Sequence, residues 1–435
     1  MINGVLKVLM ILIMLFFGFK VYTQKTLNSL KMDSIEYGKW GVGFKDTVIF
    51  DEIDDYVINN QKFKKPIWIQ IWYPSKQKVK KPMLFNEYTK LPSTFSDKLL
   101  SSIFEKSIET VISRELFYAP INELTGELTK SDTIIRAWQK LKGASVYAQR
   151  NLPVSDEKFP LILYHHGAQS VPFDNNIACE YWASKGFVVI SAWYNLPTEY
   201  GLSRSPIDTI VIEKGDTTIG SKSTFRRDML KVSQFSKKLK YVNTNYTIGV
   251  GHSLGAQSWL EYDFSDYPKI ANTIISLHTT AESDTPTEME EFHSNLLPLT
   301  DYRAKNATTI TYMLAPKNPL WYEQLLPITD TINDPGFAPF RLNKYTPYIF
   351  LAGPYINHNS FISWLPWQSY LVRFDKSFGF GYGTDFLNRQ WKYYREVITL
   401  TSDIMNAELH NNEFQIQEKL KSNWRMELFN ITKKK

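Results

Sequence analysis

Short apolar runs, bounded by glycine, proline and polar residues, recur along most of the chain. Runs of this length are typical of buried β-strands, whereas helices need longer periodic stretches. They lie at 42–50, 67–73, 161–164, 187–192, 246–250, 270–277, 309–314 and 348–352. Pro74 ends the second run, and because proline donates no ladder hydrogen bond we expect that strand at a sheet edge.

Segments with apolar residues at helical spacing alternate with these strands. Helices are predicted at 175–184, ended by Gly186, at 225–239, from the residue after 253 to about Tyr262, and around 397–420. Strands that alternate with helices predict a parallel sheet with crossover helices. The sequence therefore predicts an α/β fold, with a mostly parallel central sheet and helices on both of its faces.

Residues 85–150 break this alternation and are predicted to form a helical insertion. Apolar residues recur at helical spacing between Leu99 and Ile112, and Ser131 is a candidate cap for a second helix through Leu141. Connections of more than about 20 residues between the predicted elements are candidates for lids and substrate loops. They are predicted at 195–220, 279–305 and 315–345.

The amino terminus carries a 12-residue apolar run, Val8 to Phe19, flanked by Lys7 and Lys20. It is shorter than the roughly 20 residues that span a bilayer. We therefore expect residues 1–23 to be a signal peptide and residues 24–435 to form a single domain, secreted or periplasmic. An uncleaved membrane anchor at the amino terminus is the alternative.

Composition excludes several classes of protein. With 43% hydrophobic and 22% charged residues among 435, the chain can bury a large core and is not disordered. Its net charge of +6 comes without a basic stripe, so a nucleic-acid partner is not expected. Cys179, the one cysteine, excludes an intramolecular disulfide and a paired-cysteine zinc site, and its apolar setting predicts a buried thiol. No metal or other cofactor is predicted.

The candidate chemistry starts at GHSLG, residues 251–255, which matches G-x-S-x-G. The motif lies between a predicted strand and a predicted helix, the setting of a nucleophile elbow, so Ser253 is the candidate nucleophile. The residue after it, Leu254, can supply one N–H to an oxyanion. Ala168, in the HHGA segment that follows another buried strand, can supply the second. Each of the two histidines of that segment is more simply explained as a packed side chain.

A candidate base follows the last predicted strand. His358 lies late in the chain, in the order nucleophile, acid, histidine, and imidazole titrates near neutral pH. A surface-loop histidine is the alternative reading.

Four segments now resemble a known family: FPLILYHHG, KGFVVISAWYN, GHSLG and HNSF. They are similar to the serine esterases of the α/β-hydrolase superfamily, and most to its platelet-activating-factor acetylhydrolase and dienelactone-hydrolase-like branch. The early WIQIWYP resembles that branch too. The resemblance implies an α/β-hydrolase fold and metal-free hydrolysis of short-chain acyl or phospholipid-like esters. It assigns Ser253 as nucleophile, His358 as base, and Ala168 and Leu254 as oxyanion donors.

The acid departs from the family pattern. In that branch a carboxylate ends the strand after the elbow helix, where this chain has His278. Glu282 is the preferred acid because it can fold back toward His358. Asp284 is an alternative close by, and Asp330 or Asp334 are more remote ones.

The leading hypothesis is a secreted serine hydrolase of carboxylic esters that works through an acyl-enzyme. Its partner is a small ester or lipid-like substrate, with contact to a membrane surface as a further option. A non-catalytic binding protein on a hydrolase scaffold is the alternative, because of His278, and a serine peptidase is another. Six aromatic residues, with the helical insertion, are expected to shape an apolar acyl pocket: Trp193, Tyr194, Trp321, Tyr322, Trp364 and Trp367.

Overall fold

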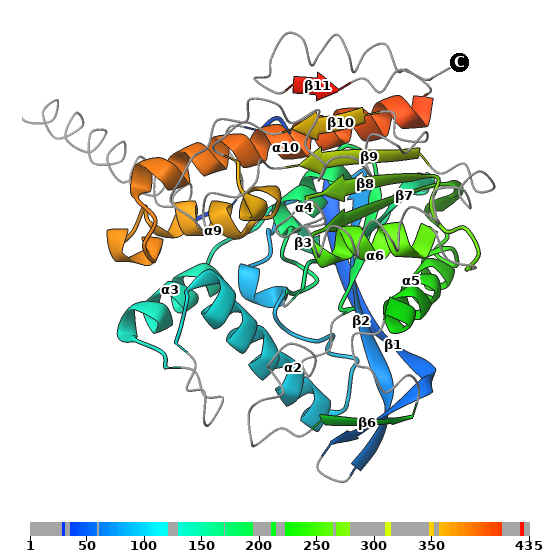
Figure 1. The fold of residues 1–435 in the computed structure, drawn as a ribbon, viewed down its shortest axis with the longest axis horizontal. Helices are drawn as coiled ribbons and strands as arrows, with labels where there is room; N and C mark the ends of the chain where they lie inside the picture. The colour runs from blue at the N-terminus through cyan, green and yellow to red at the C-terminus, as the bar shows by residue number, and fades with distance from the viewer. Residues whose placement is uncertain are drawn as a thin grey trace, which may run out of the picture.

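The computed structural model describes most of residues 28–278 and several separate segments of the chain after them (Figure 1). The residues it describes are 28–30, 35–58, 61–120, 129–168, 170–194, 210–214, 222–263, 267–278, 309–314, 348–351, 356–410 and 427–429. The predicted signal peptide, residues 1–23, lies outside these ranges. Within them, no helix has the length and apolar character needed to cross a membrane.

One mixed sheet of 11 strands organises the described chain, in the order β11-β10-β9-β8-β7-β4-β5-β2-β1-β3, with β6 paired to β1. The six neighbouring strands from β10 to β5 are all parallel, and β2 joins β5 antiparallel. The predicted parallel core is thus confirmed. The strands are β1 (Gly41–Ile58), β2 (Gln61–Ser75), β3 (Gln149–Arg150), β4 (Phe159–His165), β5 (Val188–Ala192), β6 (Ile210–Lys214), β7 (Val242–His252), β8 (Thr273–Leu277), β9 (Thr309–Leu314), β10 (Tyr348–Leu351) and β11 (Glu427–Phe429).

The position expected for β2 was wrong, because β2 lies inside the sheet between β1 and β5. Its last residues pair with β1, where Pro74 stands opposite Val42. The pairing with β5 covers only residues 69–72 of β2. Pro74 therefore lies beyond the part of β2 that pairs with β5, so its missing N–H costs no ladder hydrogen bond to β5.

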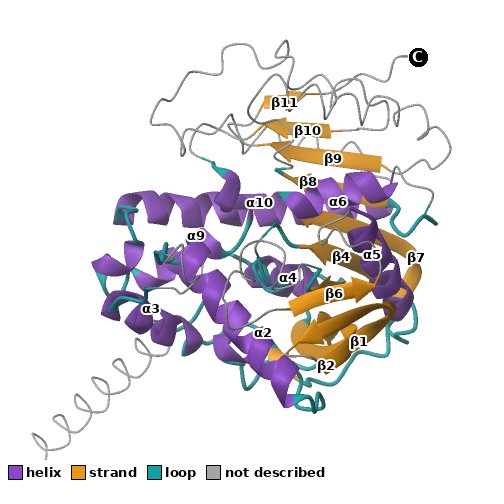
Figure 2. Ribbon diagram, turned by 60° about the horizontal axis from the view of Figure 1, so that its bottom comes forward, coloured by secondary structure: helices purple, strands orange, loops and turns teal. Residues whose placement is uncertain are grey.

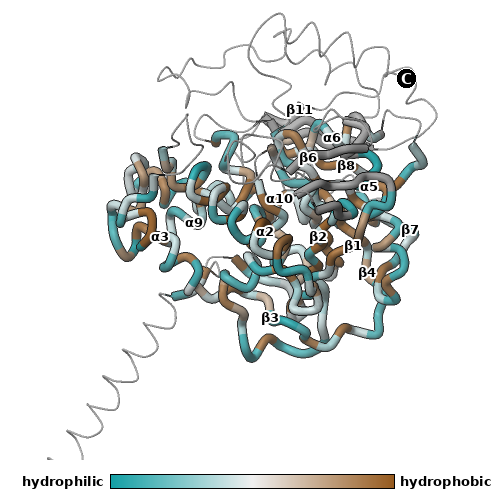
Figure 3. The backbone as a smooth tube through the Cα atoms, turned by 90° about the horizontal axis from the view of Figure 1, so that it is seen from below, coloured by the Kyte–Doolittle hydropathy of each residue, from teal (hydrophilic) through white to brown (hydrophobic). Residues whose placement is uncertain are grey.

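Helices cover both faces of the sheet (Figures 1 and 2). Side chains alternate along β4, so that Ile162 and Tyr164 join one core and Leu161 and Leu163 join the other. The first core packs against α4 (Asn176–Ser184) and α10 (Thr384–His410), and the second against α5 (Lys222–Ser236) and α6 (Leu254–Asp263). Figure 3 shows apolar stretches in the sheet beside hydrophilic loops.

Two helices occupy the region of the predicted insertion. They are α2 (Lys98–Val111), capped by Asp97, and α3 (Asp132–Lys142), whose first turn is capped by Ser131 as the sequence predicts. A five-residue π-helix, η2 (Ile112–Leu116), continues α2. Both α2 and α3 lie on the opposite side of the molecule from β11 (Figure 1).

Other elements differ from the sequence pattern at their ends. The helix predicted around 397–420 begins already at Thr384 and is described to His410. A short strand, β6, lies within the connection predicted at 195–220 and pairs with β1. The other two predicted long connections lie wholly outside the described residues. Cys179 is buried, and burial raises the pKa of its thiol well above the ordinary value.

Candidate active site

Ser253 occupies a sharp turn between the end of β7 and the start of α6. Its φ angle is 54°, in the left-handed region, which costs an L-residue roughly 1–2 kcal/mol. A Cβ at Gly251 would overlap the backbone of Gly255, and a Cβ at Gly255 would overlap the carbonyl of His165. The turn thus has the strained geometry and the glycine requirement of a nucleophile elbow.

The elbow is held against the end of β8. The Ser253 N–H donates to the carbonyl oxygens of Leu277 (3.1 Å) and His278 (3.2 Å). Within the described chain no hydrogen bond involves the Ser253 hydroxyl, and the residue lines a pocket. The hydroxyl is therefore accessible from the pocket.

His358 begins the short turn η6 (His358–Phe361) that follows β10. Asn357 fixes the turn, because its side chain accepts from the Ser360 N–H (3.1 Å) and its N–H donates to the Ser360 hydroxyl (2.9 Å). The Ser360 hydroxyl donates in turn to Gln390 on α10. The residue that the sequence predicts as the base is thus anchored to a long helix.

The Nδ1 atom of His358 lies 2.5 Å from Nδ1 of His278. His278 directly follows β8, has a φ of 48° and stacks on the Phe361 ring with a 5.9 Å centroid distance. Burial lowers the pKa of His278 to about 3. Burial first, and then the neighbouring His278, lowers the pKa of His358 well below its ordinary value.

Both imidazoles are therefore neutral at neutral pH, and one of them donates its Nδ1–H to the other. The four carboxylates considered as the acid lie outside the described residues: Glu282, Asp284, Asp330 and Asp334.

The loop after β4 approaches the elbow closely. A Cβ placed on Gly167 would lie 3.2 Å from the Ser253 Cβ and 3.1 Å from Nδ1 of His252. Ala168 follows at the pocket surface, and Leu254 is the first residue of α6, so its N–H has no carbonyl partner within the helix. Both backbone segments predicted to hold an oxyanion thus lie at the elbow.

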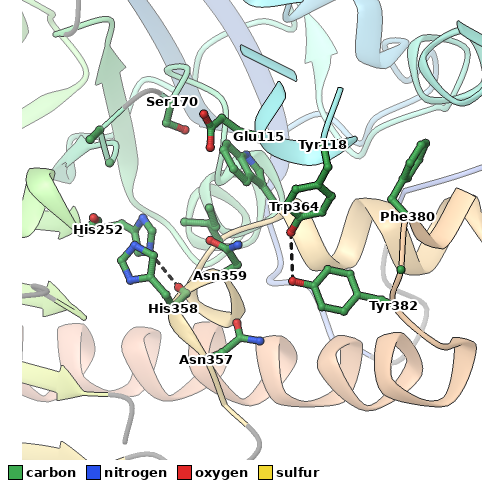
Figure 4. Close-up of a pocket in the computed structure, with 15 residues that line it drawn as sticks. Glu115, Tyr118, Ser170, His252, Asn357, His358, Asn359, Trp364, Phe380 and Tyr382 are labelled. Atoms are coloured by element: carbon green, nitrogen blue, oxygen red, sulfur yellow. Dashed lines mark hydrogen bonds between the residues drawn. The ribbon is translucent and has the colours of Figure 1, made fainter. Parts of the chain in front are cut away.

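These residues share one pocket of about 580 Å³ (Figure 4). Ser253, His358, Gly167 and Ala168 line it. Figure 4 shows His252 and His358 side by side at one end, with Tyr118, Phe380 and Tyr382 at the other. Within the residues that the structure describes, no cluster of His, Cys, Asp and Glu could hold a metal ion.

No protein-family model matches the chain, and no curated protein matches it. Solved structures do. A ferulic acid esterase from Streptomyces cinnamoneus is 14% identical, covers 86% of this chain and 93% of its own, and has a TM-score of 0.48. Est1E from Butyrivibrio proteoclasticus is 15% identical over 37% of this chain and 68% of its own, with a TM-score of 0.25. An acylaminoacyl peptidase from Pyrococcus horikoshii is 15% identical over 38% of this chain and 28% of its own, with a TM-score of 0.25.

The parallel sheet, the elbow after a central strand, the loop beside it and the histidine after β10 together decide the fold. The fold is the α/β-hydrolase fold. Helices on both faces and the antiparallel β2 complete it.

The two histidines of the HHGA segment are buried packing residues of this α/β-hydrolase fold. His165 stacks on Tyr194 at a 4.0 Å centroid distance. His166 accepts the Tyr194 N–H at Nε2 (3.2 Å), so its Nδ1–H donates to the Gly167 carbonyl (2.8 Å). Burial lowers the pKa of His166 to about 4. Neither residue is among those that line the pocket.

Asp174 is a residue of the site that the sequence analysis missed. Its buried carboxylate accepts from the hydroxyls of Ser170 (2.6 Å) and Tyr164 (2.8 Å) and from the Gly167 N–H. Its carbonyl accepts from the Ser363 N–H (2.9 Å), close to the His358 turn. Burial raises its pKa to about 7 against the lowering effect of these donors. Asp174 therefore links the loop beside the elbow to the histidine turn, and a lone acidic residue in sequence gives no signal for this.

His252 is a second residue whose position the motif alone did not reveal. Its Nε2–H donates to the His358 carbonyl (3.0 Å), and the centroids of the His252 and His358 rings lie 4.5 Å apart. Its buried Nδ1 has no partner among the described residues. Burial lowers the pKa of His252 well below its ordinary value, so it is neutral at neutral pH.

The six aromatic residues expected around an acyl pocket divide into three groups. Trp364 lines the pocket. Trp193, Tyr194 and Trp367 are buried in the cores, and Trp321 and Tyr322 lie outside the described residues.

Proposed function

We propose that the chain is a serine hydrolase of carboxylic esters, with Ser253 as nucleophile and His358 as general base. One observation carries the proposal: Ser253, on a left-handed turn at the end of β7, lines the same pocket as His358 and the Gly167–Ala168 loop. These are the parts that acyl transfer requires.

In the proposed reaction the Ser253 oxygen attacks the ester carbonyl carbon and its proton passes to Nε2 of His358. The carbonyl oxygen becomes an oxyanion, which accepts hydrogen bonds from the N–H groups of Leu254 and Ala168. When the tetrahedral intermediate collapses, the carbon–oxygen bond to the alcohol breaks, and the alcohol leaves with the proton from His358. A water then attacks the acyl-enzyme, with His358 again as base, and the carboxylic acid is released.

His278 holds the place of the acid in this proposal. If His358 donates its Nδ1–H to His278, its Nε2 keeps the lone pair that a base needs. A neutral imidazole stabilises the imidazolium less than a carboxylate does, and loss of the correct tautomer costs about 10⁴ in rate in a well-studied triad. We therefore propose a slow hydrolase, and a contribution of Glu282 to the triad remains part of the proposal.

Labelling with a fluorophosphonate tests the nucleophile. The probe forms a covalent bond to an activated serine oxygen, so peptide mass spectrometry should find the adduct on Ser253. Ser253→Ala is the control and should carry none. If folded wild-type protein takes up no label at Ser253 while p-nitrophenyl butyrate is also not hydrolysed, the proposed mechanism is refuted.

A second candidate is a binding protein without catalysis. Two observations favour it: His278 stands at the acid position, and no described residue hydrogen-bonds the Ser253 hydroxyl. It predicts that ester-like ligands bind equally well to wild-type protein and to Ser253→Ala, with no turnover. A panel of short peptides and esters separates the further alternative, a serine peptidase.

Finer parts of the proposal concern substrate class and location. The resemblance to the platelet-activating-factor acetylhydrolase branch supports short-chain acyl or phospholipid-like esters as substrates, with contact to a membrane surface. The apolar run at 8–19 supports secretion after removal of residues 1–23. Mass spectrometry of the mature amino terminus tests this, and an intact Met1 in a membrane fraction would contradict it.

A further inference from the structure

Left-handed backbone is concentrated at the pocket. In the described chain the non-glycine residues with positive φ are Tyr118, Asn151, Ser253, His278 and Phe380. Three of these five line the pocket, and His278 contacts His358, which also lines it. Such strain persists where the surrounding structure enforces it, and it gathers at functional sites.

Tyr118 and Phe380 come from distant parts of the chain. Tyr118 follows the π-helix η2, itself an irregularity often found at functional sites, and has a φ of 52°. Phe380 ends the short turn η7 (Lys376–Gly379) with a φ of 46°. They meet at the pocket through their neighbours, because the ring centroids of Phe117 and Phe380 lie 4.9 Å apart. The hydroxyls of Tyr118 and Tyr382 lie 3.1 Å apart (Figure 4).

Core packing does not explain the Tyr118 side chain. It is 49% exposed, so it gains little from burial while its backbone carries the left-handed strain, which glycine would remove. Asn151 is a contrasting case: asparagine tolerates this conformation, and its N–H donates to the Phe44 carbonyl (3.0 Å) in a turn away from the pocket. The large ring at the strained position 118 thus needs another reason. The Phe380 ring packs partly on the core beside Phe117, and it lines the pocket as well.

We propose that Tyr118, Phe380 and Tyr382, with Trp364 beside them, form a subsite that binds a planar aromatic ring carried by the ester substrate. This inference rests on the proposed function, because the ring belongs to the ester that Ser253 cleaves at the other end of the pocket. Aromatic side chains stack on a flat ring in offset or edge-to-face arrangements that an aliphatic group cannot reproduce. Burying the ring removes apolar surface from water as well.

The polar rim of the subsite restricts the ring further. Glu115, which lines the pocket, pairs with the Arg114 Nε at 2.5 Å. Its carboxylate oxygens can accept a hydrogen bond from a donor on the ring. The hydroxyls of Tyr118 and Tyr382 can hydrogen-bond a neutral polar substituent. The ligand class is therefore an ester that carries an aromatic ring with a neutral polar substituent or none.

The test compares three methyl esters, followed by acid release: methyl 3-phenylpropanoate, methyl 3-cyclohexylpropanoate and methyl hexanoate. The cyclohexyl ester has a similar apolar ring without the π-face. Wild-type protein should prefer the phenyl ester over both others by about tenfold in kcat/KM. Tyr118→Gly and Phe380→Gly, which relieve the strain and remove the rings, should each reduce this preference to about twofold or less. Asn151→Gly, a strained position outside the pocket, should leave it unchanged.

Equal or better cleavage of the cyclohexyl ester by wild-type protein would overturn the proposal, as would a preference that survives both pocket variants. Faster cleavage of an acetylated sugar than of the phenyl ester would overturn it too. Binding separates this inference from the proposed function. If no ester is cleaved by any variant, calorimetric binding of 3-phenylpropanamide to Ser253→Ala still tests the subsite. Weaker binding to Ser253→Ala/Tyr118→Gly would support ring binding, whereas equal affinity of the two variants would refute it.

Discussion

The imidazoles of His278 and His358 meet through their Nδ1 atoms at 2.5 Å, with His278 in the place where a carboxylate would orient the base. A carboxylate only accepts hydrogen bonds, so it holds the proton of the base on Nδ1 and leaves Nε2 free. An imidazole can donate or accept. With His278 as donor, the proton of His358 would sit on Nε2 and the base would be blocked. The pair therefore has one productive and one unproductive tautomer.

Replacement of His278 by aspartate should speed the reaction. The carboxylate would select the productive tautomer and stabilise the imidazolium, so we expect kcat for p-nitrophenyl butyrate to rise roughly tenfold or more. Steady-state kinetics on His278→Asp measure this, with His278→Asn as a control of similar size and no charge. If the aspartate variant folds and is no faster than the asparagine variant, an existing carboxylate already performs the task. Glu282→Gln should then lower kcat.

The pH dependence should be displaced toward acid. Burial and His278 lower the pKa of His358, and a base acts only when it is unprotonated, so kcat/KM should stay level as the pH falls through 6.5 and decline only below it. In His278→Asp the carboxylate raises this pKa, so the decline should begin at higher pH. A wild-type decline centred at or above pH 6.5 would contradict the assignment.

Folding must be monitored along the same pH series. The buried neutral histidines bind protons only in the unfolded chain between pH 6.5 and their lowered pKa values, which are about 4 for His166 and about 3 for His278. Their contribution to stability therefore falls as the pH falls below 6.5. Asp174, with a pKa raised to about 7, acts in the opposite direction, because it binds a proton in the folded state first. Tryptophan fluorescence at each pH separates loss of activity from unfolding.

The sequence predicted those residues of the candidate site whose signal is local. GHSLG between strand and helix singled out Ser253, and the position after the last predicted strand singled out His358, and both line the same pocket. The contact between His278 and His358 depends instead on how β8 and β10 are placed in the sheet, with β9 between them. Tyr118 and Phe380 join the pocket through irregular turns, which carry no hydrophobic period. The start of α10 was missed for a related reason, since only a few positions in its first three turns, such as Leu387 and Tyr394, are buried.

Asp174 should act as a positioning residue for the loop beside the elbow. Asp174→Asn keeps one acceptor but cannot accept from all three donors, so the Gly167 and Ala168 backbone should shift. Complete loss of one oxyanion donor lowers kcat by about 10²–10³. Because Asp174→Asn should only displace the donor, we expect kcat to fall by about 10–100-fold with little change in KM.

Glu180→Gln is a matched control for Asp174→Asn. Glu180 is also a buried carboxylate with a pKa raised to about 7 by burial, and it accepts from the Tyr88 hydroxyl (2.6 Å) and the Tyr147 N–H (3.1 Å). Neither hydrogen bond involves a residue of the loop after β4 that lies beside Ser253. Both substitutions should lower the melting temperature, because each weakens the hydrogen bonds of a buried carboxylate, but Glu180→Gln should retain the kcat of the folded protein. Equal losses of kcat in the two variants would mean that Asp174 acts through stability alone.

The elbow glycines should tolerate substitution by alanine much less than a glycine with open space around it. A Cβ at Gly255 would overlap the carbonyl groups of His165 and His166, which are held in β4 and its loop and cannot move away independently. Gly255→Ala should therefore lower the free energy of unfolding by about 2–3 kcal/mol and abolish Ser253 labelling.

Gly383 offers a control, because a Cβ at this position next to α10 would meet nothing within 4 Å. Gly383→Ala should leave labelling intact and leave stability unchanged or raise it by about 0.4–1 kcal/mol, because the unfolded chain loses conformational freedom. Urea denaturation of both variants measures the difference. A Gly255→Ala protein as stable and as reactive as the Gly383→Ala protein would mean that the backbone of β4 does not pack against α6 as closely as the structure has it, and the position of the oxyanion loop beside Ser253 would no longer follow.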